Sequence, residues 1–404
     1  MTPAEHPLFA QLPPAPPEAV GMDHARCQNL LQRLRQDCDG GRIPGAVVLL
    51  ARHGRTVMFE ATGWRDPVQR LPMTLDALFR IYSMTKPVTS VAALMLMERG
   101  ALLLSDALTQ TLPAFKSMQV VDATAQGGLR PASGTIKLLD LLRHTCGFSY
   151  EFMSAGVVQR AYAQARIGSR DRSSAELADT LASLPLVADP DTVWEYSRAT
   201  DVLGRVIEVI SGQSLGTHLH EHIFAPLGMH DTSFAPPVAQ HDRLAEAFGR
   251  DPDGGLQMRL FDARKRPALE SGGGGLISTA ADYARFAVCL LGQGSLDNVR
   301  LLAPATVRLM TSDHLGGRKP AQGMSQTLLP LGHGFGLGVA VRTSAGPAHE
   351  PGSVGSYFWG GMGGTTFFVD PALDLVAILM LQAPNQREYY HSLFRNLVYA
   401  TITN

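Results

Sequence analysis

The residues Ser83-Met84-Thr85-Lys86, followed by PVTSVAALMLMERG at 87–100, form the stretch from which this chain is best understood. Apolar residues occupy nearly every position after the first turn, which predicts a buried helix that stops at Gly100. Positions three apart share one helix face, so Ser83 and Lys86 can meet in the first turn. A serine that opens a helix is usually only an N-cap, so a catalytic role needs partners elsewhere in the chain.

The composition is that of a globular protein with a large core. The chain has 404 residues, 45% of them hydrophobic, which suits one large or two medium domains. Its formal net charge of −1 gives no electrostatic reason to expect nucleic acid or an anionic membrane surface as a partner. The apolar runs are too short or too interrupted to cross a bilayer.

Two features of the sequence favour the cytoplasm. The N-terminus has neither a basic segment nor an apolar one, so no export signal is visible. The four cysteines are widely scattered and form no closely spaced pair, which favours free thiols in a reducing compartment; they are Cys27, Cys38, Cys146 and Cys289. We therefore expect a cytoplasmic protein.

Strand patterns occur near both ends of the chain and helical patterns lie between them. Strand-like runs are found at 45–51, 56–61, 335–341, 365–369 and 375–381, and helical spacing at 20–40, 84–99, 201–212, 280–291 and 387–402. The short connections among the last strands favour antiparallel pairing. One sheet built from both termini, with the helical region inserted, explains this order.

These patterns predict a division of the chain into three parts. Residues 1–19 form an N-terminal extension whose Pro-rich residues 12–17 look like an extended surface segment. Residues 20–100 and 330–404 form an α/β sheet domain, and residues 101–329 form a mainly helical domain. We expect the active site between the two domains.

A serine hydroxyl is a poor nucleophile at neutral pH and needs an adjacent base. A lysine serves as that base only if its amine is partly deprotonated, which burial and nearby positive charge promote. A phenol close to the lysine could share the proton. The best candidate is Tyr196, in the loop Trp194-Glu195-Tyr196-Ser197-Arg198 just before the 201–212 helix.

Three elements in order resemble the serine β-lactamase and penicillin-recognising superfamily: Ser83-x-x-Lys86, Tyr196-Ser197, and Trp359-Gly360-Gly361. Further local matches are LLRHTCGF at 141–148, GGGLIST at 273–279 and GFGLG at 334–338. Within the superfamily the chain looks most like the class C β-lactamase-like carboxylesterases, often called family VIII. The resemblance implies an α/β (α+β) β-lactamase-like fold, with an antiparallel sheet flanked by helices and an inserted helical domain.

The resemblance also implies roles for particular residues. Ser83 is the nucleophile, and Lys86 and Tyr196 form the base system. The backbone N–H groups of Ser83 and Met362 form the oxyanion hole, where two donors stabilise the tetrahedral intermediate. No metal and no cofactor are expected, and the expected partner is a small-molecule ester.

Two departures from the family pattern bear on the substrate. Trp359 stands where true β-lactamases and peptidases place a lysine that holds a substrate carboxylate, so a flat apolar surface replaces a cation. Arg198 stands where β-lactamases usually have asparagine; it is either a cation near the substrate or a structural residue. Both changes favour uncharged esters. A β-lactamase, a D-amino-acid amide hydrolase or an acyltransferase on the same scaffold remains the alternative.

Several aromatic residues could line an apolar pocket, which points to short or medium acyl chains or aromatic esters. The candidate substrate-binding residues are Phe148, Phe152, Tyr357, Phe358 and Trp359, together with Gly360, Gly361 and Arg198.

Three other motifs suggest different chemistry. Ser214 lies in a Gly-x-Ser-x-Gly pattern, but a helix precedes it where a nucleophile elbow needs a strand, so Ser214 is interpreted as an N-cap. His218, His220 and His222 suggest a metal site, but only the first and last share a helix face. Because the sequence shows no further ligand, we interpret them as a solvent-exposed face of a helix. His144 resembles a triad base, but we expect it to form local hydrogen bonds.

Overall fold

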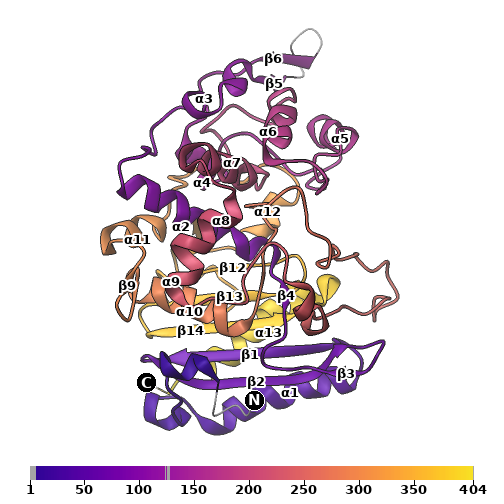
Figure 1. The fold of residues 1–404 in the computed structure, drawn as a ribbon, viewed down its shortest axis with the longest axis vertical. Helices are drawn as coiled ribbons and strands as arrows, with labels where there is room; N and C mark the ends of the chain where they lie inside the picture. The colour runs from indigo at the N-terminus through magenta and orange to yellow at the C-terminus, as the bar shows by residue number, and fades with distance from the viewer. Residues whose placement is uncertain (1–5, 123, 125–127, 404) are drawn as a thin grey trace.

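The computed structural model describes residues 6–122, 124 and 128–403. Its main feature is an eight-stranded sheet in the order β10-β11-β12-β13-β14-β1-β2-β3, in which all neighbours are antiparallel. The strands are β1 (Gly45–Arg52), β2 (Arg55–Asp66), β3 (Leu71–Pro72), β10 (His333–Phe335), β11 (Ala340–Arg342), β12 (Tyr357–Gly360), β13 (Thr366–Asp370) and β14 (Leu375–Leu381). The predicted antiparallel sheet built from both termini is confirmed, and Figure 1 shows its indigo and yellow halves side by side.

Thirteen α-helices are found in the described residues. They are α1 (His24–Asp39), α2 (Thr85–Glu98), α3 (Leu108–Thr111), α4 (Leu138–Leu142), α5 (Val157–Gln164), α6 (Ser174–Ala182), α7 (Ala199–Ser211), α8 (Leu215–Leu219), α9 (Ala225–Leu227), α10 (Ala280–Leu291), α11 (Pro304–Met310), α12 (Ser325–Leu328) and α13 (Arg387–Tyr399). Among these described helices, none is both long and apolar enough to cross a membrane.

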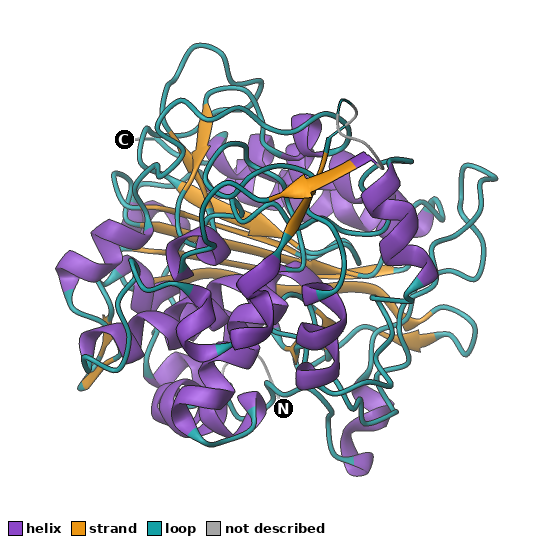
Figure 2. Ribbon diagram, turned by 90° about the horizontal axis from the view of Figure 1, so that it is seen from above, coloured by secondary structure: helices purple, strands orange, loops and turns teal. Residues whose placement is uncertain are grey.

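Helices cover both faces of the sheet (Figures 1 and 2). Helix α10 packs on β14, β1 and β13, while α1 packs on β2 and against α13. Every residue of β1 and β14 is therefore buried, and the Leu49–Ile378 pair lies at the centre of their register. A strand that is buried on both faces is apolar at consecutive positions, which explains the sequence VVLL at 47–50.

The middle of the chain forms the helical part, in which α7 contacts α2, α4 and α6. Residues 85–96 of α2 are all buried, which is why the helix is apolar on every face. In the described part of the chain, three small antiparallel pairs lie outside the main sheet. They are β4 (Phe79–Arg80) with β7 (Ile277–Ser278), β5 (Gln119–Val121) with β6 (Leu129–Pro131), and β8 (Ser295–Leu296) with β9 (Val299–Arg300).

The structure corrects three details of the expected organisation. The run 335–341 is not one strand, because Gly338 has φ +95° and the chain turns there between β10 and β11. The segment before α1 is not only a surface extension, since Leu8 and Leu12 join the core. Helix α10 packs on the sheet, although its sequence lies within the range predicted for the helical domain.

Candidate active site

Ser83 lies at the junction between β4 and α2. The segment Tyr82–Met84 forms a single 3-10 turn, and α2 begins at Thr85, so Ser83 stands just outside the helix. Tyr82 has φ +43°, a left-handed conformation that is strained for a residue with a bulky side chain. In this turn Ser83 is partly exposed and lines a pocket.

Lys86 is fully buried, and its Nζ lies 3.2 Å from the Oγ of Ser83. The structure thus brings the two residues together as their spacing predicts. The amine donates to the carbonyl oxygen of Gly273 at 2.6 Å and lies 3.0 Å from the hydroxyl of Tyr150. It also sits 4.5 Å from the centre of the Tyr196 ring. These contacts fix the amine beside the Ser83 hydroxyl.

Burial lowers the pKa of Lys86 to about 7. Desolvation is the main cause; Asp201 acts in the opposite direction, and the positive charge of Arg198 lowers the pKa further. A large fraction of the amine is therefore neutral near pH 7 and free to accept a proton. Such a pKa, close to the ambient pH, is suited to a general base.

Tyr196 is buried, and the side chain of Ser83 is close enough to lower the pKa of the Tyr196 hydroxyl against the effect of burial. This hydroxyl accepts a 3.0 Å hydrogen bond from the indole N–H of Trp359. Burial raises the pKa of Tyr196, so its phenol is protonated at neutral pH despite these hydrogen bonds. The geometry therefore favours Lys86 as the base and Tyr196 as a protonated relay.

The two residues predicted to form the oxyanion hole, Ser83 and Met362, both line the pocket. Within the described residues, neither the Ser83 N–H nor the Met362 N–H donates to a backbone carbonyl. Gly361 allows this approach, because a Cβ there would lie 2.4 Å from the carbonyl oxygen of Ile81. The pair is available to hold an oxyanion.

The pocket beside Ser83 has a volume of about 490 Å³ and is lined by residues of both parts of the molecule. From the predicted set, the lining residues are Phe152, Phe358, Trp359, Gly360, Gly361 and Met362. The helical side adds Met324, Leu328, Leu329 and Leu331, and helix α13 adds Arg387, His391 and Arg395. The apolar walls suit a hydrocarbon chain or an aromatic ring.

Phe148 and Tyr357 do not line the pocket, contrary to the sequence prediction. Phe148 is fully buried and packs 5.6 Å from the ring of Phe115 in the helical core. Tyr357 is 2% exposed, because it begins β12 and belongs to the main hydrophobic core, where Cys289 of α10 is near enough to affect its pKa. Phe148 and Tyr357 are close to site residues in the sequence, but neither ring lies at the site.

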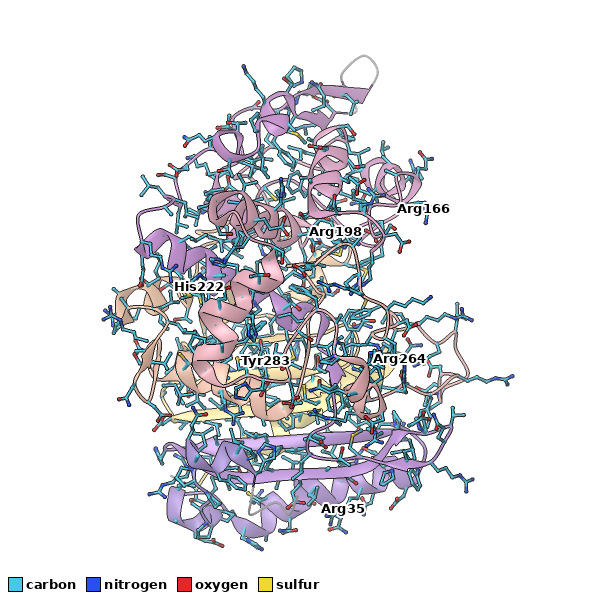
Figure 3. All side chains as sticks on the ribbon, in the orientation of Figure 1. Arg35, Arg166, Arg198, His222, Arg264 and Tyr283 are labelled. Atoms are coloured by element: carbon cyan, nitrogen blue, oxygen red, sulfur yellow. The ribbon has the colours of Figure 1, made fainter. Side chains whose placement is uncertain are left out.

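Arg198 also lies outside the pocket lining. Its guanidinium pairs with Glu151 at 2.7 Å and with Asp201 at 3.4 Å, and it stacks 4.7 Å from the ring of Tyr150. Figure 3 shows it on the helical side of the molecule, above the sheet. Of the two predicted roles, the structure favours the structural one, with an electrostatic effect on Lys86.

Sequence reasoning missed Tyr150 and gave His144 only a local role. The Tyr150 hydroxyl contacts the Lys86 amine, and its position two residues after the matched segment at 141–148 was the available signal. His144 bonds Ser197 through Nδ1 at 3.2 Å, as expected, and its ring lies 4.8 Å from that of Tyr196. Burial, reinforced by Lys86, holds the pKa of His144 well below its usual value, so the imidazole is neutral.

The other two motifs have structural explanations. Ser214 is the N-cap of α8 and accepts a 3.2 Å hydrogen bond from the Thr217 N–H, which confirms the interpretation as a cap. His218 and His222 lie together, with ring centres 4.5 Å apart. His218 is buried, so the prediction of a solvent-exposed helix face is wrong for that residue. In the described part of the chain no group of three metal-binding side chains comes together.

The chain was compared with known proteins. It is 36% identical over 357 residues to Protein Rv1367c of Mycobacterium tuberculosis, a match that covers 86% of this chain and 88% of that protein. It is 33% identical to Esterase EstB of Burkholderia gladioli, covering 84% of this chain and 86% of the relative.

Among solved structures, EstCE1, described as a hydrolase with promiscuous acyltransferase activity, superposes with a TM-score of 0.77. It is 30% identical, and the match covers 93% of this chain and 99% of EstCE1. The Beta-lactamase family matches residues 29–400, nearly the whole chain. The protein therefore belongs to the beta-lactamase family, with its α/β fold of antiparallel sheet and helices, and within that family it is similar to the family VIII esterases.

Proposed function

We propose that the protein is a serine carboxylesterase that hydrolyses short- to medium-chain or aromatic esters through an acyl-enzyme on Ser83. One observation carries the proposal: the Ser83 Oγ lies 3.2 Å from the amine of Lys86, whose pKa of about 7 makes it a base at neutral pH. An activated serine, a pair of free N–H donors and an apolar pocket are the parts that acyl transfer requires.

In the first half of the reaction the neutral amine of Lys86 takes the hydroxyl proton of Ser83 while Oγ bonds to the ester carbonyl carbon. The N–H groups of Ser83 and Met362 hold the oxyanion of the tetrahedral intermediate. The intermediate collapses by breaking the bond to the alcohol oxygen. Tyr196 gives its proton to that oxygen and regains one from the Lys86 ammonium.

In the second half a water molecule takes the place of the alcohol. The amine of Lys86 removes a proton from the water through Tyr196, and the resulting hydroxide attacks the acyl carbon. Collapse breaks the bond to Oγ, which recovers its proton, and the acid is released. Trp359 keeps the Tyr196 hydroxyl in place through both halves, because its indole N–H is bonded to it.

The pocket favours uncharged groups next to the reacting carbon. Trp359 offers an indole ring where the family's peptidases and β-lactamases have a lysine, so no ammonium is available there for a substrate carboxylate. A β-lactamase or D-amino-acid amide hydrolase is therefore less well supported. An acyltransferase is the stronger alternative, because an alcohol that replaces water uses the same residues, and EstCE1 carries both descriptions.

The test uses 4-nitrophenyl esters of graded acyl length, a chromogenic cephalosporin and a D-alanyl amide. Ester hydrolysis is expected to fall at least 1000-fold in Ser83→Ala and in Lys86→Met, as for other activated nucleophiles. Ser214→Ala is the matched control, since that serine only caps α8, and it should retain the wild-type rate. Preserved hydrolysis in Ser83→Ala would exclude the proposal.

Product analysis distinguishes the two candidate functions. Wild-type enzyme is incubated with ester and an added primary alcohol, and the acid and the new ester are measured. A dominant new ester at low alcohol concentration would favour the acyltransferase. Intact mass spectrometry should detect Ser83 carrying the acyl group in either case.

A further inference from the structure

The pocket continues beyond Ser83 to the other face of the sheet. Strand β11 pairs only with Tyr357 and Phe358 of β12, so the following residues of β12 have a free edge on that side. The pocket passes this edge, and its far end is formed by Phe358, Phe368 and helix α13. A substrate in the pocket therefore has access to side chains of α13.

Arg395 of α13 is the unusual residue at this far end. It is only 7% exposed, yet within the described residues its guanidinium has no hydrogen-bond acceptor and no ion-pair partner. Its contacts are the rings of Phe358 at 4.1 Å and Phe368 at 5.2 Å. Arg80 and Arg342 are equally buried, but each donates to several oxygen atoms.

The neighbouring acids do not neutralise Arg395 by direct contact. Glu350 accepts a 2.6 Å hydrogen bond from Ser392, and Asp370 accepts one of 2.7 Å from Tyr399. Among the described residues neither forms an ion pair with Arg395, although their charges act on its pKa. Glu350 also lines the pocket, so a bound carboxylate would lie near this acid as well as near Arg395. Arg387, the other arginine at the pocket wall, is already paired with Glu388 at 3.2 Å.

A buried guanidinium remains charged and presents a fork of N–H donors that matches a carboxylate. The Arg395 nitrogens are not among the fully enclosed, unpartnered atoms, so they reach the space of the pocket. Stacking on aromatic rings offsets only part of the cost of keeping this charge largely out of water. An anionic ligand in the pocket would satisfy it. Because the rings of Phe358 and Phe368 lie against the guanidinium, the charge is held in position before any ligand arrives.

The distance to the reacting carbon follows from β12. Gly361 packs against the carbonyl of Ile81, just before the turn that holds Ser83. The ring of Phe358 packs against the guanidinium of Arg395. These two positions are three residues apart on an extended strand, or about 10 Å. We propose that Arg395 is a subsite for a carboxylate at the far end of the ester substrate, an inference that rests on the proposed esterase function.

The test compares matched acid and amide substrates. One pair carries the charge on the acyl side: the 4-nitrophenyl monoester of azelaic acid and the same ester of azelaic monoamide. The other carries it on the alcohol side: the acetate esters of 8-hydroxyoctanoic acid and its amide. Wild type should prefer the acid in at least one pair by about 30-fold in kcat/KM, the range of a buried charge pair.

Arg395→Gln should bring that preference close to one, and Arg395→Lys should keep only part of it, because an ammonium lacks the fork. Arg35→Gln is the matched control and should change the preference less than about threefold, since Arg35 is an exposed arginine of α1 that does not line the pocket. Equal rates for acid and amide in both pairs, or a preference that survives in Arg395→Gln, would overturn the proposal.

Calorimetry separates this proposal from the esterase function. Azelaic monoamide is titrated into Ser83→Ala and into Ser83→Ala/Arg395→Gln, so no turnover is needed. Binding that is lost with Arg395 supports the subsite even if no ester is hydrolysed. Equal binding to both variants contradicts it, whatever the esterase assay shows.

Discussion

The substitution Lys86→Met is expected to inactivate the enzyme and yet stabilise it at neutral pH. Burial moves the pKa of Lys86 from 10.5 to about 7. Each pKa unit corresponds to about 1.4 kcal/mol, so the charged lysine costs the folded state about 5 kcal/mol below pH 7. The variant loses the bonds to Gly273 and Tyr150, roughly 2 kcal/mol together. The net gain at pH 6 is about 3 kcal/mol.

The pH dependence of the stability difference tests whether the buried charge of Lys86 is its cause. Because the folded pKa lies below the unfolded value, the protein releases this proton on folding between pH 7 and 10.5. The cost is complete below pH 7, shrinks by about 1.4 kcal/mol per pH unit above it, and is absent above pH 10.5. Above about pH 9 the wild-type protein should therefore be more stable to unfolding than the Lys86→Met variant.

Scanning calorimetry of both proteins from pH 6 to 10 measures this crossing. In a chain of this length 1 kcal/mol corresponds to about 1 °C, so the variant should melt about 3 °C higher at pH 6. Ser83→Ala keeps the buried lysine and should follow the wild-type pH dependence. A difference between wild type and Lys86→Met that stays constant across pH would refute the argument.

Three further predictions concern activity. The kcat/KM for a neutral ester should rise with increasing pH, with a midpoint near pH 7, because only the neutral Lys86 amine accepts the proton. Arg198→Gln removes a positive charge that lowers the pKa of Lys86, so in that variant the midpoint should move to higher pH. Trp359→Phe removes the N–H bond to Tyr196 and should lower kcat about tenfold, with little change in KM. Gly361→Ala places a Cβ 2.4 Å from a carbonyl of the nucleophile turn and should lower both melting temperature and kcat.

Each of these has a control or a contrary outcome. A rate that is flat between pH 5 and 9 would show that Lys86 is not the titrating base. If Trp359→Phe changed KM as much as kcat, the indole would act on substrate binding rather than on Tyr196. Gly346→Ala is the control for Gly361, because no atom lies within 4 Å of the added Cβ, and it should behave as wild type.

Parts of the site could be predicted because they depend on local geometry. Ser83 and Lys86 meet because residues three apart share a helix face, and the structure places their side-chain atoms 3.2 Å apart. The central strands could be predicted from consecutive apolar residues and short turns, as at 375–381, where β14 has the expected bounds. Ser214 could be rejected as a nucleophile because a helix precedes it.

Other parts depend on contacts between distant segments. Phe148 and Tyr357 are aromatic and near site residues in sequence, but both pack into the main hydrophobic core, Phe148 against the ring of Phe115. The strand expected at 335–341 turns at Gly338, where a Cβ would lie 2.4 Å from Ser90 of α2. No local pattern carries that information.

The sequence by itself determined the Ser83–Lys86 pair and the antiparallel sheet, because spacing and hydrophobic periodicity act over a few residues. Only the tertiary structure decided the chemistry of these groups. The pKa of Lys86 falls to about 7 because α2 is enclosed by other elements, and the phenol of Tyr196 stays protonated because it is buried beside Trp359. Burial and electrostatic fields sum over residues that are far apart in the chain, so they exist only once it has folded.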